Sequence, residues 1–231
     1  MDRRRFLTRT ALSAAAASLA SAPATAEKPK EKKEGRWNVV LVTVDDMKAT
    51  ALACYGNPWI QSPSTDRLAE EGSTFERAYT QFPKCVPCRA SLLTGRYPHV
   101  EGHRTLPGFM LRPEEPDLAR LLRSHGYHTG HIGKNHTANP DHLAEMFDEV
   151  PSLHHGRGGR LLGKPKENDP MFRAFYRGKW IPKRSLEDHS EVRIAEAARD
   201  FIRRNRSRRF FLMVNFHLPH TPYIEYSPWA E

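Results

Sequence analysis

Two continuous apolar runs predict the central strands of the fold. Residues 37–44 and 210–216 are rich in β-branched and aromatic side chains without polar alternation, which is typical of strands buried on both faces of a parallel sheet. Residues 127–133 form a shorter strand candidate. Residues 114–124 and 187–205 carry apolar side chains at helical spacing and predict amphipathic helices. Together these elements predict an α/β fold with a mostly parallel central sheet.

The segments between these elements carry turn and capping signals. Residues 62–72 predict a capped helix that stops at Gly72. Residues 73–80 alternate in polarity and predict an edge strand. Residues 151–185 are rich in Gly, Pro and basic residues and predict a surface loop, with a substrate-facing insertion as the alternative.

A further predicted helix begins next to the first candidate catalytic residue, Cys85. Good helix formers follow Pro87, and Gly95 stands where a helix C-cap is expected, so Cys85 should lie just before the helix. The free backbone N–H groups at a helix N-terminus stabilise a thiolate or another anion beside them. Arg89, about one turn further, can turn back toward the same point, and its planar guanidinium suits sulfate or phosphate oxygens. A nucleophile-like residue and an anion site therefore coincide.

Two adjacent carboxylates, Asp45 and Asp46, end the first strand. Open α/β sheets bind ligands at the carboxyl ends of their strands. Two carboxylates held there need a nearby cation to remain charged. The pair is therefore a candidate metal site, although adjacent acids at a strand end also serve as caps or turn residues.

Lys134 and His136 follow the strand candidate at residues 127–133. Residues two apart on an extended segment point to the same side, so both can reach one oxyanion. The second buried strand runs into a turn that contains His217 and His220. In a chain with 12 histidines, any one of them is more often structural than catalytic, so position alone assigns none of them a role.

Cys85 and Cys88 also form a Cys-x-x-Cys pair, which occurs in redox proteins and as half of a zinc site. A zinc site needs further ligands, and the one remaining cysteine, Cys54, stands alone. A thioredoxin-like motif follows a strand and opens a long helix, which this segment matches only in part. We interpret Cys54 as a core or loop thiol, with a disulfide as the alternative in an exported chain.

The composition is that of a globular protein preceded by an export signal. The chain has 231 residues, of which 39% are hydrophobic and 10% aromatic, enough for one domain with a substantial core. Residues 1–26 resemble a twin-arginine-type signal peptide, with an alanine-rich segment too short and too weakly apolar to span a bilayer. We therefore expect a bacterial periplasmic or secreted protein without stable membrane insertion.

Residues 27–36 predict a basic linker, and residues 37–231 the folded part. The formal net charge is +9, and it falls to +6 without residues 1–26, which hold four arginines and one aspartate. A positive balance suits an anionic substrate, although a solvated tether is the better explanation of the linker's share. Neither zinc-finger spacing nor an aromatic RNA-binding strand occurs, so no nucleic-acid partner is predicted.

These motifs together resemble the type I sulfatase family. The run that begins at Cys85, Cys-x-Pro-Cys-Arg-x-Ser-Leu-Leu-Thr-Gly, is similar to the family signature. The resemblance also includes Val-Asp-Asp, Tyr-Gly-Asn with Pro-x-x-Asp-Arg-Leu-Ala, Gly-Lys-x-His and a Pro-His-x-Pro turn, and it spans residues 37–150 and 187–225. The commonest family form has Ser at the position of Cys88 and Trp at the position of Asn135, so the chain departs there.

The resemblance implies a fold, a nucleophile and a metal. The implied fold is a three-layer α/β/α sandwich with a mostly parallel central sheet, alkaline phosphatase-like and incomplete at the C-terminus. Residues 37–231 would be the N-terminal part of a sulfatase catalytic domain. Cys85 would be oxidised to formylglycine by a maturase, and Arg89 would steady the formylglycine hydrate, which is the catalytic nucleophile. Asp45, Asp46 and Cys85 would hold a divalent metal ion, calcium by preference and magnesium as the alternative.

The resemblance also assigns the groups that handle the sulfate ester. Lys134 and His220 bind the sulfate group, His220 protonates the leaving oxygen, and His136 is the base that releases sulfate. The implied substrate is a sulfated small molecule or glycan. Family members continue beyond the turn at His220 and take further metal ligands and another lysine from there. We therefore expect this segment, a fragment or one part of a larger assembly, to be unstable or inactive alone.

Two other function classes remain open. Formylglycine-dependent phosphonate or phosphodiester hydrolases share the motif. A truncated, non-catalytic remnant that binds sulfated glycans is the other class. A redox role for Cys85 and Cys88 ranks last.

Overall fold

The computed structural model describes residues 37–100, 102, 110–151, 181–184, 190–220 and 224–226. The predicted signal peptide, the basic linker and most of the predicted loop at 151–185 lie outside these residues. Among the described helices, none combines the length and the apolar character that a membrane crossing requires.

Three parallel strands form the central sheet. β1 (Val39–Asp45) and β2 (His128–Gly133) both pair with β4 (Phe210–Pro219), in the order β1-β4-β2. The predicted parallel sheet is therefore confirmed. Because the strands are parallel, their carboxyl ends meet at one edge of the sheet, where ligands bind in this class of fold.

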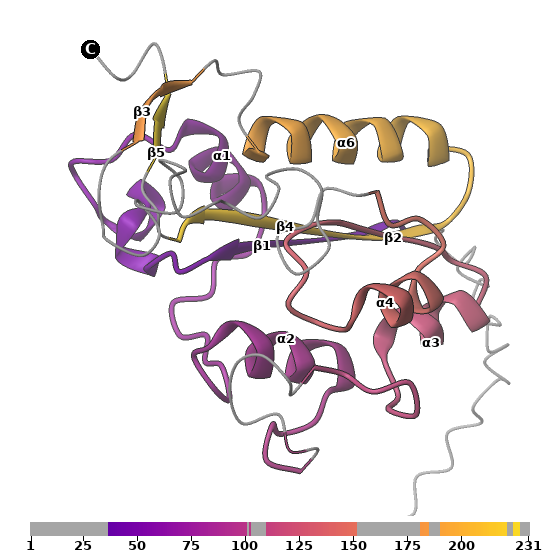
Figure 1. The fold of residues 1–231 in the computed structure, drawn as a ribbon. Coiled ribbons are helices and arrows are strands. Elements are labelled where there is room, and N and C mark those ends of the chain that lie inside the picture. The colour runs from indigo at the N-terminus through magenta and orange to yellow at the C-terminus, as the bar shows by residue number, and fades with distance from the viewer. Residues whose placement is uncertain are drawn as a thin grey trace, which may run out of the picture. The chain divides into compact units, whose positions relative to one another are not determined.

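Helices cover both faces of the sheet and complete three layers. Figure 1 shows α6 (Ser190–Asn205) on one face, and α2 (Cys85–Thr94), α3 (Leu118–Ser124) and α4 (Pro140–Met146) on the other. The α/β/α sandwich that the resemblance implies is confirmed. The N-terminus of α2 lies at the carboxyl edge of the strands, because its first residue, Cys85, is next to Asp45 at the end of β1.

The alternating side chains of β4 build two separate cores. Odd-numbered positions pack with α2, α3 and α4, and even-numbered positions pack with α6. Burying one such side chain stabilises the fold by roughly 1.5–3 kcal/mol, so the central strand fixes both helical layers. The strand residues concerned are Phe211 and Met213 on one face, and Phe210, Leu212 and Val214 on the other.

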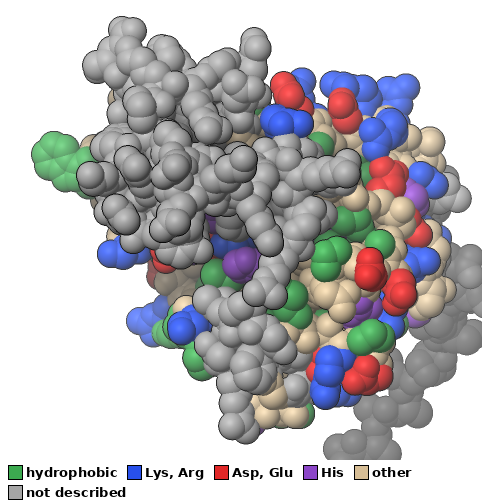
Figure 2. All heavy atoms as spheres, viewed as in Figure 1, with side chains coloured by type: hydrophobic (Ala, Val, Ile, Leu, Met, Phe, Trp, Pro, Cys, Tyr) green, Lys and Arg blue, Asp and Glu red, His purple; other side chains and the backbone are tan. Residues whose placement is uncertain are grey.

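α6 confirms the amphipathic pattern predicted for residues 187–205. Its Ile194, Ala198 and Phe201 are buried against β2 and β4. Its outer face is charged, and Figure 2 shows Lys, Arg, Asp and Glu side chains gathered over this helix. The helix therefore lies with its polar face in solvent and its apolar stripe on the sheet.

The prediction that the first strand is buried on both faces is wrong. Val40, Val42 and Val44 expose 43%, 53% and 37% of their surface. β1 is an edge strand of the described sheet, and α6 packs mainly over β4 and β2. The buried central strand is β4, so an apolar run identified a sheet strand but not its position in the sheet.

The prediction of an edge strand at residues 73–80 is also wrong, because this segment joins no described sheet. It follows η1 (Ala49–Ala51), η2 (Ala53–Tyr55) and α1 (Pro63–Glu71), the helix predicted to end at Gly72. Alternating polarity predicts a strand only where a neighbouring strand supplies the hydrogen bonds.

The helix predicted at 114–124 is shorter than expected. It begins at Leu118 because Asp117 is its N-cap and accepts a hydrogen bond from the backbone of Arg120. α4 was not predicted, although its start carries a clear signal. Asn139 caps the helix and Pro140 stands at its first position.

A second, two-stranded parallel sheet joins β3 (Ile181–Arg184) to β5 (Ile224–Tyr226). β3 lies within the residues predicted as a loop. That prediction is therefore wrong for these four residues.

Gly133 is a point where the fold tolerates no side chain. Its φ is 96°, and a Cβ atom there would overlap the carbonyl oxygen of Asn215. We expect Gly133→Ala to lower the free energy of unfolding by about 1–2 kcal/mol from the left-handed backbone and by a further 1–3 kcal/mol or so from crowding. Urea denaturation measures this loss.

Gly126→Ala is the matched control for this prediction. Gly126 has a φ of 81°, but a Cβ atom there would meet nothing within 4 Å. Gly126→Ala should therefore lower the free energy of unfolding only by the contribution of the left-handed backbone. Equal losses of stability in the two variants would contradict a clash between a Cβ atom at position 133 and the carbonyl of Asn215.

Candidate active site

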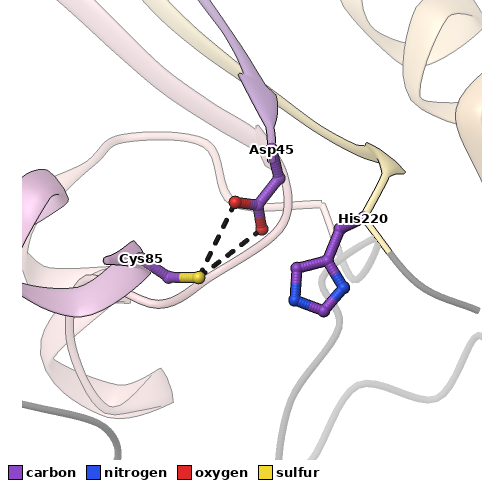
Figure 3. Close-up of side chains that lie close together, drawn as sticks. All are labelled: Asp45, Cys85 and His220. Atoms are coloured by element: carbon purple, nitrogen blue, oxygen red, sulfur yellow. Dashed lines mark hydrogen bonds between the residues drawn. The ribbon is translucent and has the colours of Figure 1, made fainter. Parts of the chain in front are cut away.

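Three side chains from distant parts of the chain converge beyond the carboxyl edge of the sheet. Asp45 ends β1, Cys85 begins α2, and His220 directly follows β4. Their potential ligand atoms all lie within 4.8 Å of one another. Figure 3 shows the three side chains pointing toward a common space, with Cys85 Sγ 3.6 and 3.8 Å from the two carboxylate oxygens of Asp45.

The position of Cys85 follows from the ends of α2. Lys84 is the N-cap residue, and Gly95 closes the helix in the left-handed conformation with its N–H donated to Ser91. Ala90 and Leu93 are buried in one core with Phe211 and Met213 of β4, which holds the helix against the sheet. Cys85 therefore lies in the first turn of α2, one residue inside the helix rather than just before it.

Lys134 joins this group from the end of β2. Its Nζ forms an ion pair with Asp45 Oδ2 and lies 4.0 Å from Cys85 Sγ. The residue is only 1% exposed. A buried ammonium group needs such a partner, because its charge has lost the stabilisation of water.

Asp45 remains a carboxylate at neutral pH. Burial raises its pKa, but the hydrogen bond and charge of Lys134, together with the charges of Arg89 and His220, outweigh this effect and lower the pKa below its ordinary value. A charged carboxylate at this edge of the sheet is the group that a cation requires.

Cys85 is not stabilised as a thiolate, contrary to the expectation from its helix position. Burial raises its pKa, and the neighbouring Asp45 carboxylate raises it further, although Lys134 and Arg89 act in the opposite direction. Cys54, Cys85 and Cys88 are all free thiols in the structure. A protonated, unbridged Cys85 does not have the low pKa typical of redox-active cysteines.

Arg89 lies beneath this group with only 5% of its surface exposed. Its Nη1 donates a hydrogen bond of 3.1 Å to Thr43 Oγ1. Burial lowers its pKa, while Asp45, Cys85 and Cys88 oppose that shift, and a guanidinium remains protonated at any physiological pH. The site therefore holds two fixed cations, Lys134 and Arg89.

Asp46 and His136, the remaining predicted site residues, are not part of the three-residue group. Asp46 is exposed and takes a left-handed conformation with a φ of 61°, so the chain turns sharply after Asp45. His136 is partly buried, two residues beyond Lys134. Their assignment to metal binding and to base catalysis stays a prediction.

Three further residues support the site and were not predicted. Thr43 and Asn215 connect Arg89 to the sheet interior. Glu191, in the first turn of α6, accepts a hydrogen bond of 3.0 Å from the backbone of His217 and so holds the segment before His220. Burial raises the pKa of Glu191, although its hydrogen bonds oppose this. No local sequence signal links residues so far apart in the chain.

The chemistry of the three-residue group suits a cation. It combines a carboxylate, a thiol and an imidazole. Calcium and magnesium prefer oxygen ligands, which Asp45 supplies directly. Thiol and imidazole ligands suit zinc instead, but the raised pKa of Cys85 disfavours the thiolate that zinc binds.

The three-layer α/β/α fold, with these residues at the carboxyl edge of its parallel sheet, is of the alkaline phosphatase-like type. A family model for Sulfatase matches residues 37–231. The chain belongs to the sulfatase family.

The curated relatives are sulfatases with different named substrates. Steryl-sulfatase of Rattus norvegicus is 38% identical over 143 residues, which cover 57% of this chain and 24% of the relative. Arylsulfatase of Clostridium perfringens is 29% identical over 211 residues, which cover 80% and 44%. N-acetylgalactosamine-6-sulfatase of Rattus norvegicus is 32% identical over 211 residues, covering 80% and 40%. The chain thus spans less than half the length of these relatives.

Three solved structures are similar to this chain in fold. BT4656 in complex with its substrate D-glucosamine-2-N,6-O-disulfate is 27% identical, with a TM-score of 0.59 over 79% of this chain and 34% of that one. Ps i-CgsB in complex with k-i-k-neocarrahexaose is 25% identical, with a TM-score of 0.60 over 80% and 46%. A phosphonate monoester hydrolase of Agrobacterium radiobacter shares the fold, with 24% identity and a TM-score of 0.60 over 83% and 42%.

The charges around Cys85 predict opposite effects of two substitutions on its pKa. Lys134→Met should raise the pKa of the thiol further, because a cation that favours the thiolate is removed and Asp45 remains. Asp45→Asn should lower it, because the carboxylate that disfavours the thiolate is removed. The rate of alkylation against pH measures both.

The experiment uses protein in which Cys85 has not been converted. Cys54 and Cys88 are both replaced by serine, so that Cys85 is the one thiol that can be alkylated. Shifts of the same sign in the two variants would contradict the assignment of these charges. So would a parent thiol that titrates below the ordinary cysteine pKa.

Proposed function

We propose that this protein is a sulfuric ester hydrolase that cleaves sulfate monoesters through a formylglycine hydrate formed at position 85. The observation that carries the proposal is the convergence of Cys85 with Asp45, Lys134 and His220 at the carboxyl edge of the sheet. Membership of the sulfatase family supports the reaction class.

Hydrolysis of a sulfate ester requires stabilisation of charge on the sulfate oxygens and an in-line nucleophile. Lys134 and Arg89 are buried cations whose positions are fixed by Asp45 and Thr43. They need no reorganisation when charge develops, which is where fixed charges contribute most to catalysis. Lys134 and His220 are the proposed sulfate-binding residues, and Arg89 is proposed to steady the formylglycine hydrate.

The proposed reaction has two steps. One hydroxyl of the hydrate gives its proton to solvent as it attacks sulfur, the bond from sulfur to the alcohol oxygen breaks, and protonated His220 gives the departing oxygen a proton. His136 then takes the proton of the second hydroxyl, the bond from carbon to the sulfated oxygen breaks, and sulfate leaves. The aldehyde of formylglycine is thereby restored, and addition of one water molecule regenerates the hydrate.

The state of the encoded thiol agrees with this use of position 85. Its Sγ stands for the oxygen of the modified residue, and burial keeps the thiol protonated and poorly nucleophilic. Sulfate esterified to a simple hydroxyl would have to be removed by attack at sulfur. A hydrate releases it by breaking its own carbon–oxygen bond, so a maturase that converts Cys85 is a necessary partner.

A divalent cation is the proposed cofactor, calcium by preference and magnesium as the alternative. Asp45 is held as a carboxylate at the site, and Asp46 and the oxygen of the modified residue 85 are the further proposed ligands. When bound, the ion polarises oxygen and lowers the pKa of the hydrate. The ion pair of Asp45 with Lys134 already compensates part of the carboxylate charge.

The proposed substrate is a sulfated carbohydrate. Two of the similar solved structures hold sugars, glucosamine disulfate and a carrageenan oligosaccharide. With the predicted export signal at residues 1–26, the proposed place of action is the periplasm or the outside of the cell.

Conversion of Cys85 is the first test. In the native protein purified from its source organism, we expect the peptide containing residue 85 to have lost one sulfur and two hydrogens and gained one oxygen. We expect Cys85→Ser to remove this change and to lower aryl sulfate turnover by roughly three orders of magnitude or more, as loss of a nucleophile does. Peptide mass spectrometry and a chromogenic assay measure the two effects.

Cys88→Ser is the matched control, because the commonest family form has Ser at this position. It should leave both conversion and turnover in place. An unmodified Cys85, free or bridged to Cys88, would contradict the proposal, and faster hydrolysis of an aryl phosphonate than of an aryl sulfate would reassign the substrate class.

Metal binding is a separate test of the same site. Calcium at about 100 times its Kd should raise the free energy of unfolding by about 2.7 kcal/mol. Asp45→Asn should abolish this stabilisation, because it removes the charged ligand. Denaturation with and without calcium or magnesium measures the effect.

Asp200→Asn on the outer face of α6 controls for general loss of negative charge, since its side chain is 56% exposed. Stabilisation by calcium that survives Asp45→Asn would contradict the assignment.

A further inference from the structure

A chain of hydrogen bonds runs from Arg89 across the interior of the sheet. Arg89 Nη1 is 3.1 Å from Thr43 Oγ1, Thr43 Oγ1 is 2.6 Å from Asn215 Oδ1, and Asn215 Nδ2 is 2.8 Å from His131 Nε2. The four side chains come from α2, β1, β4 and β2. Asn215 and His131 are 0% and 1% exposed. The hydrogen bond between Asn215 and His131 is buried, and a hydrogen bond shielded from water is strengthened.

The guanidinium fixes the direction of every bond in this chain. Arg89 can only donate, so Thr43 Oγ1 accepts from it. The hydroxyl proton of Thr43 must then go to an acceptor, which is Asn215 Oδ1. The amide group of Asn215 is left to donate, so His131 Nε2 must be unprotonated. The histidine is therefore neutral, with its proton on Nδ1.

Asn215 connects both cations of the site. Its side chain leads through Thr43 to Arg89, and its backbone carbonyl accepts a hydrogen bond of 2.8 Å from the backbone N–H of Lys134. Thr43 also stands two residues before Asp45 on the same face of β1. The network thus touches the elements that present Asp45, Lys134 and Arg89.

Arg89 depends on this network for its orientation. Arginine carries about 2 kcal/mol of side-chain conformational entropy, and the Nε of Arg89 has no hydrogen-bond partner among the described residues. The contact with Thr43 is therefore an anchor that a buried guanidinium needs if it is to keep one direction.

We propose that Thr43, Asn215 and His131 are positioning residues that hold the Arg89 guanidinium toward residue 85. The catalytic part of this inference rests on the proposed function, in which Arg89 steadies the formylglycine hydrate. A displacement of about 1 Å at such a group lowers turnover by up to 100-fold. Displacement of the Arg89 guanidinium affects the nucleophile and not the binding of substrate. It should therefore lower kcat and leave KM unchanged.

The test compares the variants Thr43→Val and Thr43→Ser, each expressed in and purified from the source organism of the protein. Valine keeps the shape of the side chain and removes the hydroxyl, whereas serine keeps the hydroxyl. We expect Thr43→Val to lower kcat for an aryl sulfate by about 10- to 100-fold with little change in KM. We expect Thr43→Ser to restore most of kcat.

Thr129→Val controls for the general effect of removing the hydroxyl of a buried threonine. Thr129 is 0% exposed, and its hydroxyl donates to Asp148 at the opposite end of the sheet. Thr129 is registered with Phe211 and Thr43 with Asn215, so the two sites are four residues apart along β4, about 13 Å at 3.3 Å per residue. An equal loss of kcat in Thr129→Val and Thr43→Val would overturn the inference.

Nitrogen-15 NMR of the unsubstituted protein tests the network without any activity. We expect the His131 signals to show a neutral ring with the proton on Nδ1, assigned by comparison with His131→Gln. We expect slow rotation of the Arg89 guanidinium, which becomes fast in Thr43→Val. A protonated Nε2 or an unchanged Arg89 signal would overturn the inference. If these spectra agree and the protein has no sulfatase turnover, the proposed function fails and the network stands.

Discussion

The ion pair between Lys134 and Asp45 is the interaction on which the site depends. These residues follow β2 and end β1, the two strands that flank β4, so the pair reaches across the end of the central strand. Removing one partner of a buried pair leaves an uncompensated charge, which costs about 3–5 kcal/mol. The pair therefore requires the three strands to keep their register. Gly133 makes this register possible because it lets Lys134 approach the backbone of Asn215.

The sequence predicted the parts of the site that follow from strand ends. Asp45, Lys134 and His220 each come directly at or after a strand, and parallel strands bring their carboxyl ends to one edge. Cys85 was predicted from the helix signals of α2, which are local as well. The resemblance to sulfatases supplied the roles of these residues. The structure confirmed the fold, whereas the roles stay proposals.

The remainder of the structure depends on contacts that no local pattern encodes. An apolar run does not tell whether a strand is central or at an edge, so β1 was expected to be buried and is not. The pKa of Cys85 was expected to be low from the helix N-terminus alone, but burial and the distant Asp45 raise it. Thr43 and Asn215 are 172 residues apart in the chain and meet only because β1 pairs with β4.

The balance of charge around residue 85 explains why these parts belong together. Lys134 and Arg89 are two buried cations, and Asp45 is the carboxylate that faces them with Cys85. A thiolate at position 85 would meet these cations, but burial and the adjacent carboxylate keep the thiol neutral. The excess positive charge is thus left for an anion that enters the site. The proposed sulfate ester substrate is such an anion, and its binding would complete the pairing of charges among the described site residues.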